Sequence, residues 1–179
     1  RRRNPEEPGT GRMKNLSRNR WMAVVIALIV VADWVTKAMV QRRFPEQGDR
    51  WTLIEGWLTF QHSINHGISW GMMSGEHHGA WRMPLLIVLT LVGIGATVSI
   101  VRQSRDRWIH VAGALVLGGA LGNLGDRLLN GGVTDFIYVH FFPYIFNVAD
   151  IFISIGGVLL VARMLLDARR GGESAPTHA

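Results

Sequence analysis

The sequence contains no cysteine among its 179 residues. Disulfide bridges and a thiol nucleophile are therefore excluded. The chain also lacks a glycine-rich phosphate-binding loop followed by Lys and Ser or Thr, and it lacks the G-x-S-x-G motif of serine hydrolases. If the chain performs hydrolytic chemistry, that chemistry has to come from side chains other than cysteine and a serine in this motif.

A zinc peptidase motif is missing as well. His62 and His66 are four residues apart and His77 and His78 are adjacent, but the segment HSINH lacks the glutamate of the H-E-x-x-H motif. The residues around it indicate strand and turn rather than the helix that this motif requires. We therefore predict no metal ion and no other cofactor.

Charged residues are missing from several long apolar segments. Residues 84–101 form a run of 18 residues without a charge, which is about 27 Å of helix at about 1.5 Å per residue. Residues 21–32 are uncharged, residues 109–125 contain no Asp, Glu, Lys or Arg, and residues 144–162 contain one acid, Asp150. A soluble domain of this size would have to bury four helices that are hydrophobic all round, so we predict transmembrane helices.

The predicted fold is an all-α integral membrane protein with four transmembrane helices. A small extracytoplasmic β-sheet or hairpin is expected between the first two helices, because residues 51–64 combine β-branched and aromatic residues around a central glycine. Residues 13–170 form the single membrane domain, after a disordered or non-native extension at 1–12 and before a flexible cytoplasmic tail at 171–179. The helices and the β element are predicted at about 19–42, 44–71, 84–101, 108–129 and 145–166.

The net charge of +6 does not indicate a nucleic-acid partner, because the basic residues flank the apolar runs. They gather before the first run, between the second and third, and after the fourth. By the positive-inside rule, both termini and the loop at 102–107 are cytoplasmic. The segments 42–83 and 127–145 then face outward.

The segment 118–150 is the polar centre of the chain. It carries three carboxylates, Asp126, Asp135 and Asp150, between two apolar runs. We expect Asp126 and Asp150 at helix ends and Asp135 in the loop that joins these helices. Carboxylates beside membrane spans are costly unless they are paired or functional. Two carboxylates held close together share one proton, so that one can act as general base on water while the other acts as general acid.

Further polar residues share helix faces with two of these acids. Asn123 lies at i, i+3 from Asp126 and at i, i+4 from Arg127, and Asn147 lies at i, i+3 from Asp150. The two asparagines could therefore orient the acids or a substrate backbone. Asp126 and Arg127 are more consistent with bracing the site by ion pairing with neighbouring residues than with chemistry.

The first predicted helix carries a polar pair of its own. Asp33 and Lys37 are i, i+4 neighbours near its outward end. They belong either to a polar site or to an interfacial ion pair whose lysine snorkels to the membrane surface. The alternatives to an enzyme are a proton-coupled transporter and a non-catalytic membrane scaffold. A transporter needs an acid near mid-span, whereas these acids lie toward the outward ends.

Five short blocks carry most of these polar residues. They are DWVTK at 33–37, NHGISWG at 65–71, GNLGDR at 122–127, VTDF at 133–136 and FNVAD at 146–150. In this order, and with matching hydropathy over about residues 14–166, they resemble the bacterial lipoprotein signal peptidases, the signal peptidase II family.

The resemblance implies an integral membrane aspartyl endopeptidase with four helices. Such enzymes remove signal peptides from prolipoproteins, cutting on the amino side of a cysteine that carries a diacylglyceryl group. The catalytic pair of the family corresponds to Asp135 and Asp150 of this chain. The supporting and substrate-binding positions correspond to Asp33, Lys37, Asn65, Gly67, Asn123, Asp126, Arg127 and Asn147.

The resemblance also implies a location and partners. The enzyme is expected as a multi-pass protein of the bacterial cytoplasmic (inner) membrane, with its active site near the outer face. Its partners are the prolipoprotein substrate with its diacylglyceryl-cysteine and the membrane lipids. We expect a monomer.

Overall fold

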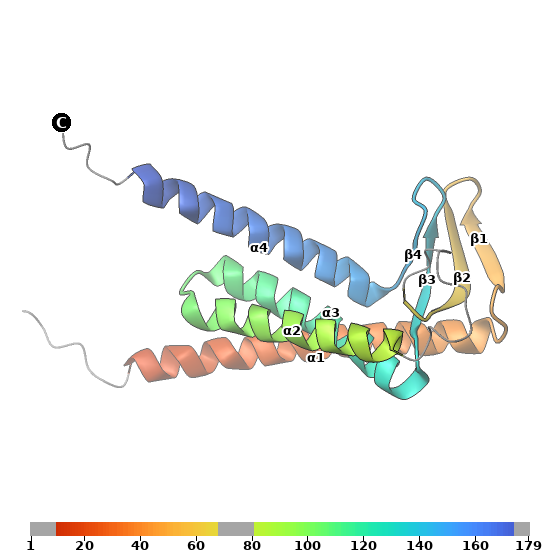
Figure 1. Ribbon diagram of the computed structural model, residues 1–179, viewed down its shortest axis with the longest axis horizontal. Coiled ribbons are helices and arrows are strands. Elements are labelled where there is room, and N and C mark those ends of the chain that lie inside the picture. The colour runs from red at the N-terminus through yellow and green to blue at the C-terminus, as the bar shows by residue number, and fades with distance from the viewer. Residues whose placement is uncertain (1–9, 68–80, 174–179) are drawn as a thin grey trace, which may run out of the picture.

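Four long helices lie beside one another, with a small sheet at one end of them (Figure 1). The structure, a computed structural model, describes residues 10–67 and 81–173. The helices are α1 (Thr10–Arg43), α2 (Arg82–Gln103), α3 (Arg107–Asn130) and α4 (Val148–Glu173), and the strands are β1 (Arg50–Ile54), β2 (Leu58–Asn65), β3 (Val133–Val139) and β4 (Ile145–Phe146). The beginning of α1 and the end of α4 lie at the end of the molecule opposite the sheet.

Two predicted terminal segments fall largely outside this description. Of the proposed extension at 1–12, residues 1–9 lie outside the described residues, and residues 10–12 belong to α1. Of the proposed tail at 171–179, residues 174–179 lie outside them, and residues 171–173 belong to α4.

Each helix contains a stretch that is long and apolar enough to cross a membrane. The stretches are Arg18–Arg43, Arg82–Gln103, Arg107–Asn130 and Val148–Arg169. Large apolar side chains stay exposed on their surfaces, for example Leu28 (63%), Val92 (63%) and Val158 (73%). An exposed apolar surface of this extent is a liability in water, and it is satisfied when it faces lipid. The prediction of a multi-pass membrane protein is confirmed.

Helix α3 is the centre of the helical layer and contacts the other three helices. Glycines on α3 allow this close packing. A Cβ atom at Gly119 would lie 2.4 Å from the backbone oxygen of Ala149 in α4, and one at Gly122 would lie 2.7 Å from a carboxylate oxygen of Asp33 in α1. Both α1 and α4 therefore approach α3 at the level where its polar residues begin.

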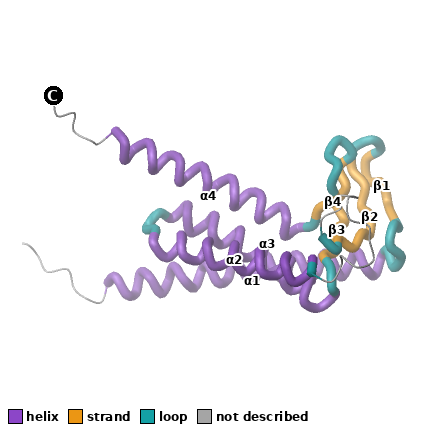
Figure 2. The backbone as a smooth tube through the Cα atoms, viewed as in Figure 1, coloured by secondary structure: helices purple, strands orange, loops and turns teal. Residues whose placement is uncertain are grey.

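The sheet combines strands from two distant parts of the chain. Its order is β1–β2–β3–β4, and all neighbours are antiparallel. Strands β1 and β2 follow α1, whereas β3 and β4 lie between α3 and α4, and all four gather at one end of the helices (Figure 2). The β element predicted at 44–71 is present but forms only half of the sheet.

The prediction of a loop around Asp135 is wrong, because this residue lies within strand β3. The segment VTDFIYV is rich in β-branched and aromatic residues, which favour a pleated, half-buried strand. Its pairing partner β2 is about 70 residues away in sequence, with Ser63 opposite Asp135. Local hydropathy does not reveal a pairing of this kind. Gly131, at a left-handed φ of 66°, ends α3 and turns the chain back into β3.

Candidate active site

The beginning of α4 is fixed by a reciprocal pair of hydrogen bonds between Asn147 and Asp150. The backbone N–H of Asp150 donates to Asn147 Oδ1 (2.9 Å), and the backbone N–H of Asn147 donates to Asp150 Oδ2 (3.2 Å). This arrangement is a capping box, with Asn147 before the first helical turn and Asp150 in it. The positive end of the helix dipole also favours a carboxylate there. The sequence of α4 therefore places Asp150 at a defined position, half-buried at the sheet end of the helix.

Asp135 reaches the same place from strand β3 and is 3% exposed. Its Oδ1 accepts a hydrogen bond from the side-chain amide of Asn147 (2.6 Å), and its Oδ2 accepts one from Asn65 Nδ2 in β2 (2.9 Å). The backbone of Asn147 contacts Asp150, while its side chain contacts Asp135. A single residue thus connects the two carboxylates.

The environment of Asp135 favours a proton on it. The pKa of Asp135 is raised from its ordinary 3.8 to about 6, first by burial and then by the charge of Asp150, against the lowering effects of the Asn65 and Asn147 hydrogen bonds and of the charge of Lys37. A carboxyl group with this pKa keeps its proton to a higher pH than an ordinary aspartate does, so Asp135 can be protonated at a pH where an ordinary aspartate is ionised. This is the condition for a carboxylate pair that holds one proton.

Asn123 of α3 joins the pair to a second polar cluster. Its Nδ2 donates to Asp150 Oδ1 (2.8 Å), and its Oδ1 accepts from Asn147 Nδ2 (3.1 Å) and from Lys37 Nζ (3.0 Å). Both ends of this amide are therefore bonded inside the protein, and Asn123 is 4% exposed. A buried polar network with bonded members holds its side chains in one arrangement.

Lys37 lies at the centre of the second cluster. Its Nζ is 2.8 Å from Asp33 Oδ2 and 3.3 Å from Asp126 Oδ2. Lys37 is 3% exposed and Asp33 is fully buried, so the lysine does not snorkel to the surface. Asp33 Oδ1 also accepts the backbone N–H of Ala149 (2.9 Å). The pair that the sequence placed on one face of α1 therefore binds the first turn of α4.

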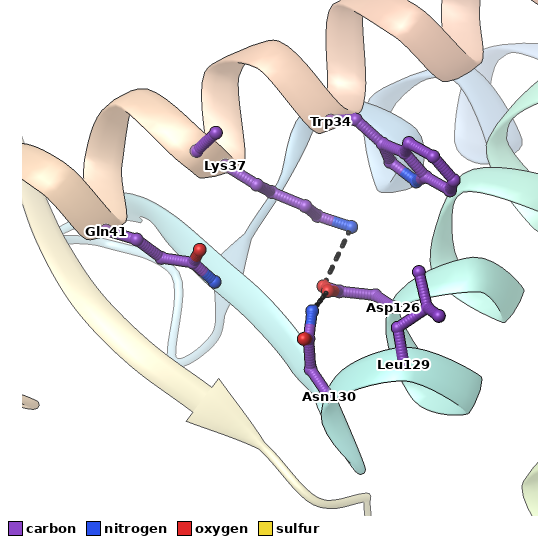
Figure 3. A pocket seen from close by; sticks show the side chains of 7 residues that line it. Trp34, Lys37, Gln41, Asp126, Leu129 and Asn130 are labelled. Carbon is purple, nitrogen blue, oxygen red and sulfur yellow. Dashed lines mark hydrogen bonds and ion pairs between the residues drawn. The ribbon is translucent and has the colours of Figure 1, made fainter.

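Asp126 holds the beginning of strand β3. It accepts the backbone N–H of Thr134 (2.7 Å), the residue before Asp135, and the side-chain amide of Asn130 (2.5 Å). Figure 3 shows Lys37 of α1 and Asn130 of α3 pointing toward Asp126, which is also in α3. The three residues line a cavity of about 180 Å³. These contacts join Asp126 to α1 and β3, and its expected bracing role stays a prediction.

Three residues of this cluster were not among the predicted site residues. They are Gln41, Asn130 and Thr134. Gln41 donates to Thr134 Oγ1 (2.9 Å) and so contacts the same residue of β3 that Asp126 holds. Spacing gave a usable signal for two of them, because Gln41 is at i, i+4 from Lys37 and Asn130 is at i, i+4 from Asp126. Thr134 depends on the fold of β3 and gave none.

Arg127 and Gly67 occupy the edges of the site. Arg127 donates weakly to the backbone oxygen of Asn123 (3.4 Å), and it forms none of the ion pairs found within the described residues. With Asn123 and Asp150 it lines a cavity of about 320 Å³ between α2, α3 and α4. The backbone N–H of Gly67, at a φ of 83°, donates to Asn65 Oδ1 (2.8 Å). This bond turns the donor side of the Asn65 amide toward Asp135.

The histidines do not form a metal centre in the part of the chain that the structure describes. No group of three or more His, Asp or Glu side chains within residues 10–67 and 81–173 is placed to hold an ion. His77, His78 and residues 68–71 of the NHGISWG block lie outside the described residues. The chemistry available at the site is that of two neighbouring carboxylates supported by amides and one lysine.

Comparisons with known proteins identify a family for the chain. The profile of a protein family described as signal peptidase (SPase) II matches residues 25–166. The lipoprotein signal peptidase of Staphylococcus carnosus is 35% identical over 152 residues, which cover 82% of this chain and 91% of that protein. The lipoprotein signal peptidase of Aquifex aeolicus is 34% identical over 152 residues, covering 83% and 88%.

Two solved structures share the fold over most of the chain. One structure described as a bacterial membrane enzyme is 29% identical in sequence, with a TM-score of 0.71 over 88% of this chain and 93% of that one. A second structure with this description is 31% identical, with a TM-score of 0.70 over 80% and 92%. All five sequence blocks lie within the residues that the family profile matches.

Proposed function

The chain belongs to the signal peptidase II family, and we propose that it removes signal peptides from prolipoproteins as an aspartyl endopeptidase. The proposed catalytic residues are Asp135 and Asp150. One observation carries this assignment: both carboxylates hydrogen-bond to Asn147, one to its side chain and one to its backbone. Two acids from a strand and from a helix terminus are thereby held together at the sheet end of the membrane helices.

The proposed mechanism uses one proton shared by the pair. The ionised carboxylate takes a proton from water, and this water attacks the scissile carbonyl carbon. The protonated carboxyl gives its proton to the carbonyl oxygen or to the leaving nitrogen. The two steps belong to the pair as a unit, because its protonation equilibria are coupled. Asn123 and Asn147 keep the acids oriented through the hydrogen bonds that they donate.

Lys37 has an electrostatic role in this proposal. It lies among three acceptors, Asp33, Asn123 and Asp126, and none of its contacts is with Asp135 or Asp150. Its charge offsets the two supporting carboxylates, so that the catalytic pair does not face two further uncompensated negative charges. Lys37 also donates a hydrogen bond to Asn123 Oδ1, which orients the side chain so that Asn123 Nδ2 donates to Asp150.

The proposed substrate is a prolipoprotein whose cysteine carries a diacylglyceryl group. The cavity of about 320 Å³ that Asp150, Asn123 and Arg127 line is otherwise walled by small or apolar residues of α2, α3 and α4, including Gly93 and Ala120. A short segment with small side chains, next to the cysteine, fits such a space. The acyl chains remain in lipid, which is favourable by about 0.8 kcal/mol per CH₂ group.

We also propose an orientation in the bacterial cytoplasmic membrane. The sheet and the catalytic pair face outward, and both termini lie in the cytoplasm. The connection between α2 and α3 lies at the end of the helices away from the sheet (Figure 1), and the basic residues Arg102, Arg105 and Arg107 in and beside it support this orientation. The candidate site is assembled from α1, α3, α4 and the sheet of one chain, which supports a monomer as the active form.

A comparison of two synthetic substrates tests the proposed function. Purified protein is incubated with a signal-peptide-bearing peptide whose cysteine carries a diacylglyceryl group, and with the same peptide carrying an unmodified cysteine. Mass spectrometry identifies the products. We expect one cut, on the amino side of the lipidated cysteine, and no product from the unmodified peptide. Equal cleavage of both peptides, or a cut elsewhere, contradicts the proposed specificity.

A further inference from the structure

An apolar groove lies where the end of α1 meets the sheet. It has a volume of about 340 Å³ and is lined by Met39, Val40, Arg43, Phe44, Trp51 and Phe60. The rings of Trp51 and Phe60 stack at 6.2 Å and form its wall on the sheet side. Arg43 is the single charged residue among those that line it.

This groove continues an exposed apolar stripe along α1. The stripe consists of Val24, Leu28, Val31, Val35 and Met39, each at least half exposed. The spacing of three or four residues places them on one face of the helix, and Arg43 follows Met39 at the next such step. One leaflet of the hydrocarbon core is about 15 Å thick, or about ten residues of helix. The stripe beside the groove is therefore long enough to accommodate an acyl chain.

The guanidinium group of Arg43 is held by an aromatic ring and can still bind an anion. Its guanidinium group stacks over the ring of Phe44, with 5.5 Å between the guanidinium carbon and the ring centroid. Stacking occupies the face of the guanidinium and leaves its N–H edges for an acceptor. Arg43 takes part in none of the ion pairs of residues 10–67 and 81–173.

The groove is separate from the catalytic pair. Phe136 belongs to the same buried cluster as Val40 and Phe44. Successive side chains of a strand point to opposite faces, so Asp135 and Phe136 lie on opposite faces of β3. The groove therefore lies on the face of the sheet opposite Asp135. An occupant of the groove does not occupy the proposed active site.

We propose that this groove binds a membrane glycerophospholipid, with its phosphate on Arg43 and one acyl chain along the α1 stripe. A guanidinium group binds a phosphate through two parallel N–H···O bonds. Arg43 is the last residue of a stretch long and apolar enough to cross a membrane, and the ends of such a stretch lie near the polar lipid headgroups. A diacylglyceryl group without a phosphate lacks the charge that Arg43 complements, so the occupant is a lipid of the membrane and not the lipid of the substrate.

Native mass spectrometry of the full chain tests this proposal. The protein is released from micelles containing either dioleoylphosphatidylglycerol or dioleoylglycerol, and dissociation constants are derived from the bound fractions. We expect a retained phosphatidylglycerol and weaker binding of dioleoylglycerol. Arg43→Gln should weaken phosphatidylglycerol binding about tenfold, because the charge-assisted hydrogen bonds to the phosphate are lost.

Two further variants complete the test. Arg42→Gln is the matched control, because it removes the same charge from the adjacent position, which does not line the groove. Its affinity should stay near that of the parent protein. Met39→Trp fills the groove and should weaken binding without changing the charge. Equal losses in the Arg42 and Arg43 variants, undiminished binding in Met39→Trp, or equal affinity for dioleoylglycerol overturns the proposal.

Discussion

At the scale of single residues, Asn147 connects more of the site than any acid does. It caps α4 through Oδ1, and its Nδ2 contacts both Asp135 and Asn123. A small substitution can separate these two tasks. Serine is also a preferred residue at the cap position, but its hydroxyl is too short to replace the amide at Asp135.

The first prediction concerns Asn147→Ser. Because the cap is retained, the thermal unfolding temperature should stay near that of the parent protein. Because Asp135 loses its shortest hydrogen bond, the cleavage rate should fall about 100-fold, as expected for a misplaced catalytic group. Thermal unfolding and initial cleavage rates measure the two effects. An unchanged rate would show that Asn147 serves only the helix terminus.

The second prediction concerns the proton on Asp135. Its pKa of about 6 lies above the ordinary value of 3.8, because the residue is buried and because Asp150 is charged. Protonated Asp135 therefore stabilises the folded protein fully below pH 3.8, and this contribution is lost as the pH rises through about 6. In Asp150→Asn the neighbouring charge is absent and burial remains. The pKa of Asp135 should then fall but stay above 3.8.

Infrared spectroscopy measures this pKa directly. The carboxyl band of Asp135 is identified by its loss in Asp135→Asn and is followed as a function of pH in the parent protein and in Asp150→Asn. A pKa that rises or stays constant in Asp150→Asn would contradict the electrostatic coupling of the two acids.

At the scale of elements, the position of the site depends on how closely α3 approaches α1 and α4. Gly119 leaves no room for a side chain, because a Cβ atom there would lie 2.4 Å from the backbone oxygen of Ala149. Ala149 is held by Asp33 and lies next to Asp150. Any displacement of α4 at this point moves Asp150, the proposed catalytic acid on this helix.

The third prediction compares two glycine substitutions. Gly119→Ala should lower the free energy of unfolding by about 1–3 kcal/mol, the usual cost of overpacking, and should also reduce cleavage. Gly157→Ala in α4 is the control, because a Cβ atom there has no neighbour within 4 Å. It should be neutral or slightly stabilising. Unfolding of the detergent-solubilised variants measures the difference. Equal stability of both variants would contradict the close contact.

The elements also show what the sequence could and could not predict. Long uncharged runs were sufficient to predict the helices, since each run satisfies the length of a membrane span by itself. The polar pairs Asp33–Lys37 and Asn147–Asp150 followed from helical spacing. The strand that contains Asp135 could not be predicted from local sequence. Strand β3 is stabilised by pairing with β2, and the whole of α2 and α3 lies between these strands in the sequence. The bond from Asp126 to Thr134 depends on this pairing and was also missed.

At the scale of the whole molecule, the absence of cysteine becomes an experimental advantage, because introduced cysteines have no background. Glu46 lies exposed between α1 and β1, at the sheet end. Arg105 lies exposed in the connection between α2 and α3, at the other end. The proposed orientation places these residues on opposite sides of the membrane.

The fourth prediction is the labelling of single-cysteine variants in intact cells with a membrane-impermeant maleimide. Glu46→Cys should react in intact cells, and Arg105→Cys should react only after the membrane is permeabilised. The two variants control each other, since both sites are exposed. The reverse pattern would place the sheet in the cytoplasm and would contradict the proposed location of the active site.

The most direct test of the central claim is the cleavage rate of three Asp→Asn variants with the diacylglyceryl peptide. The claim is that Asp135 and Asp150 act together on water, so Asp135→Asn and Asp150→Asn should each lower the rate about 1,000-fold or more. Asp106→Asn is the control, because Asp106 caps α3 and asparagine caps equally well. It should leave the rate nearly unchanged. Near-normal cleavage by either Asp135→Asn or Asp150→Asn, in a folded protein, would contradict the account.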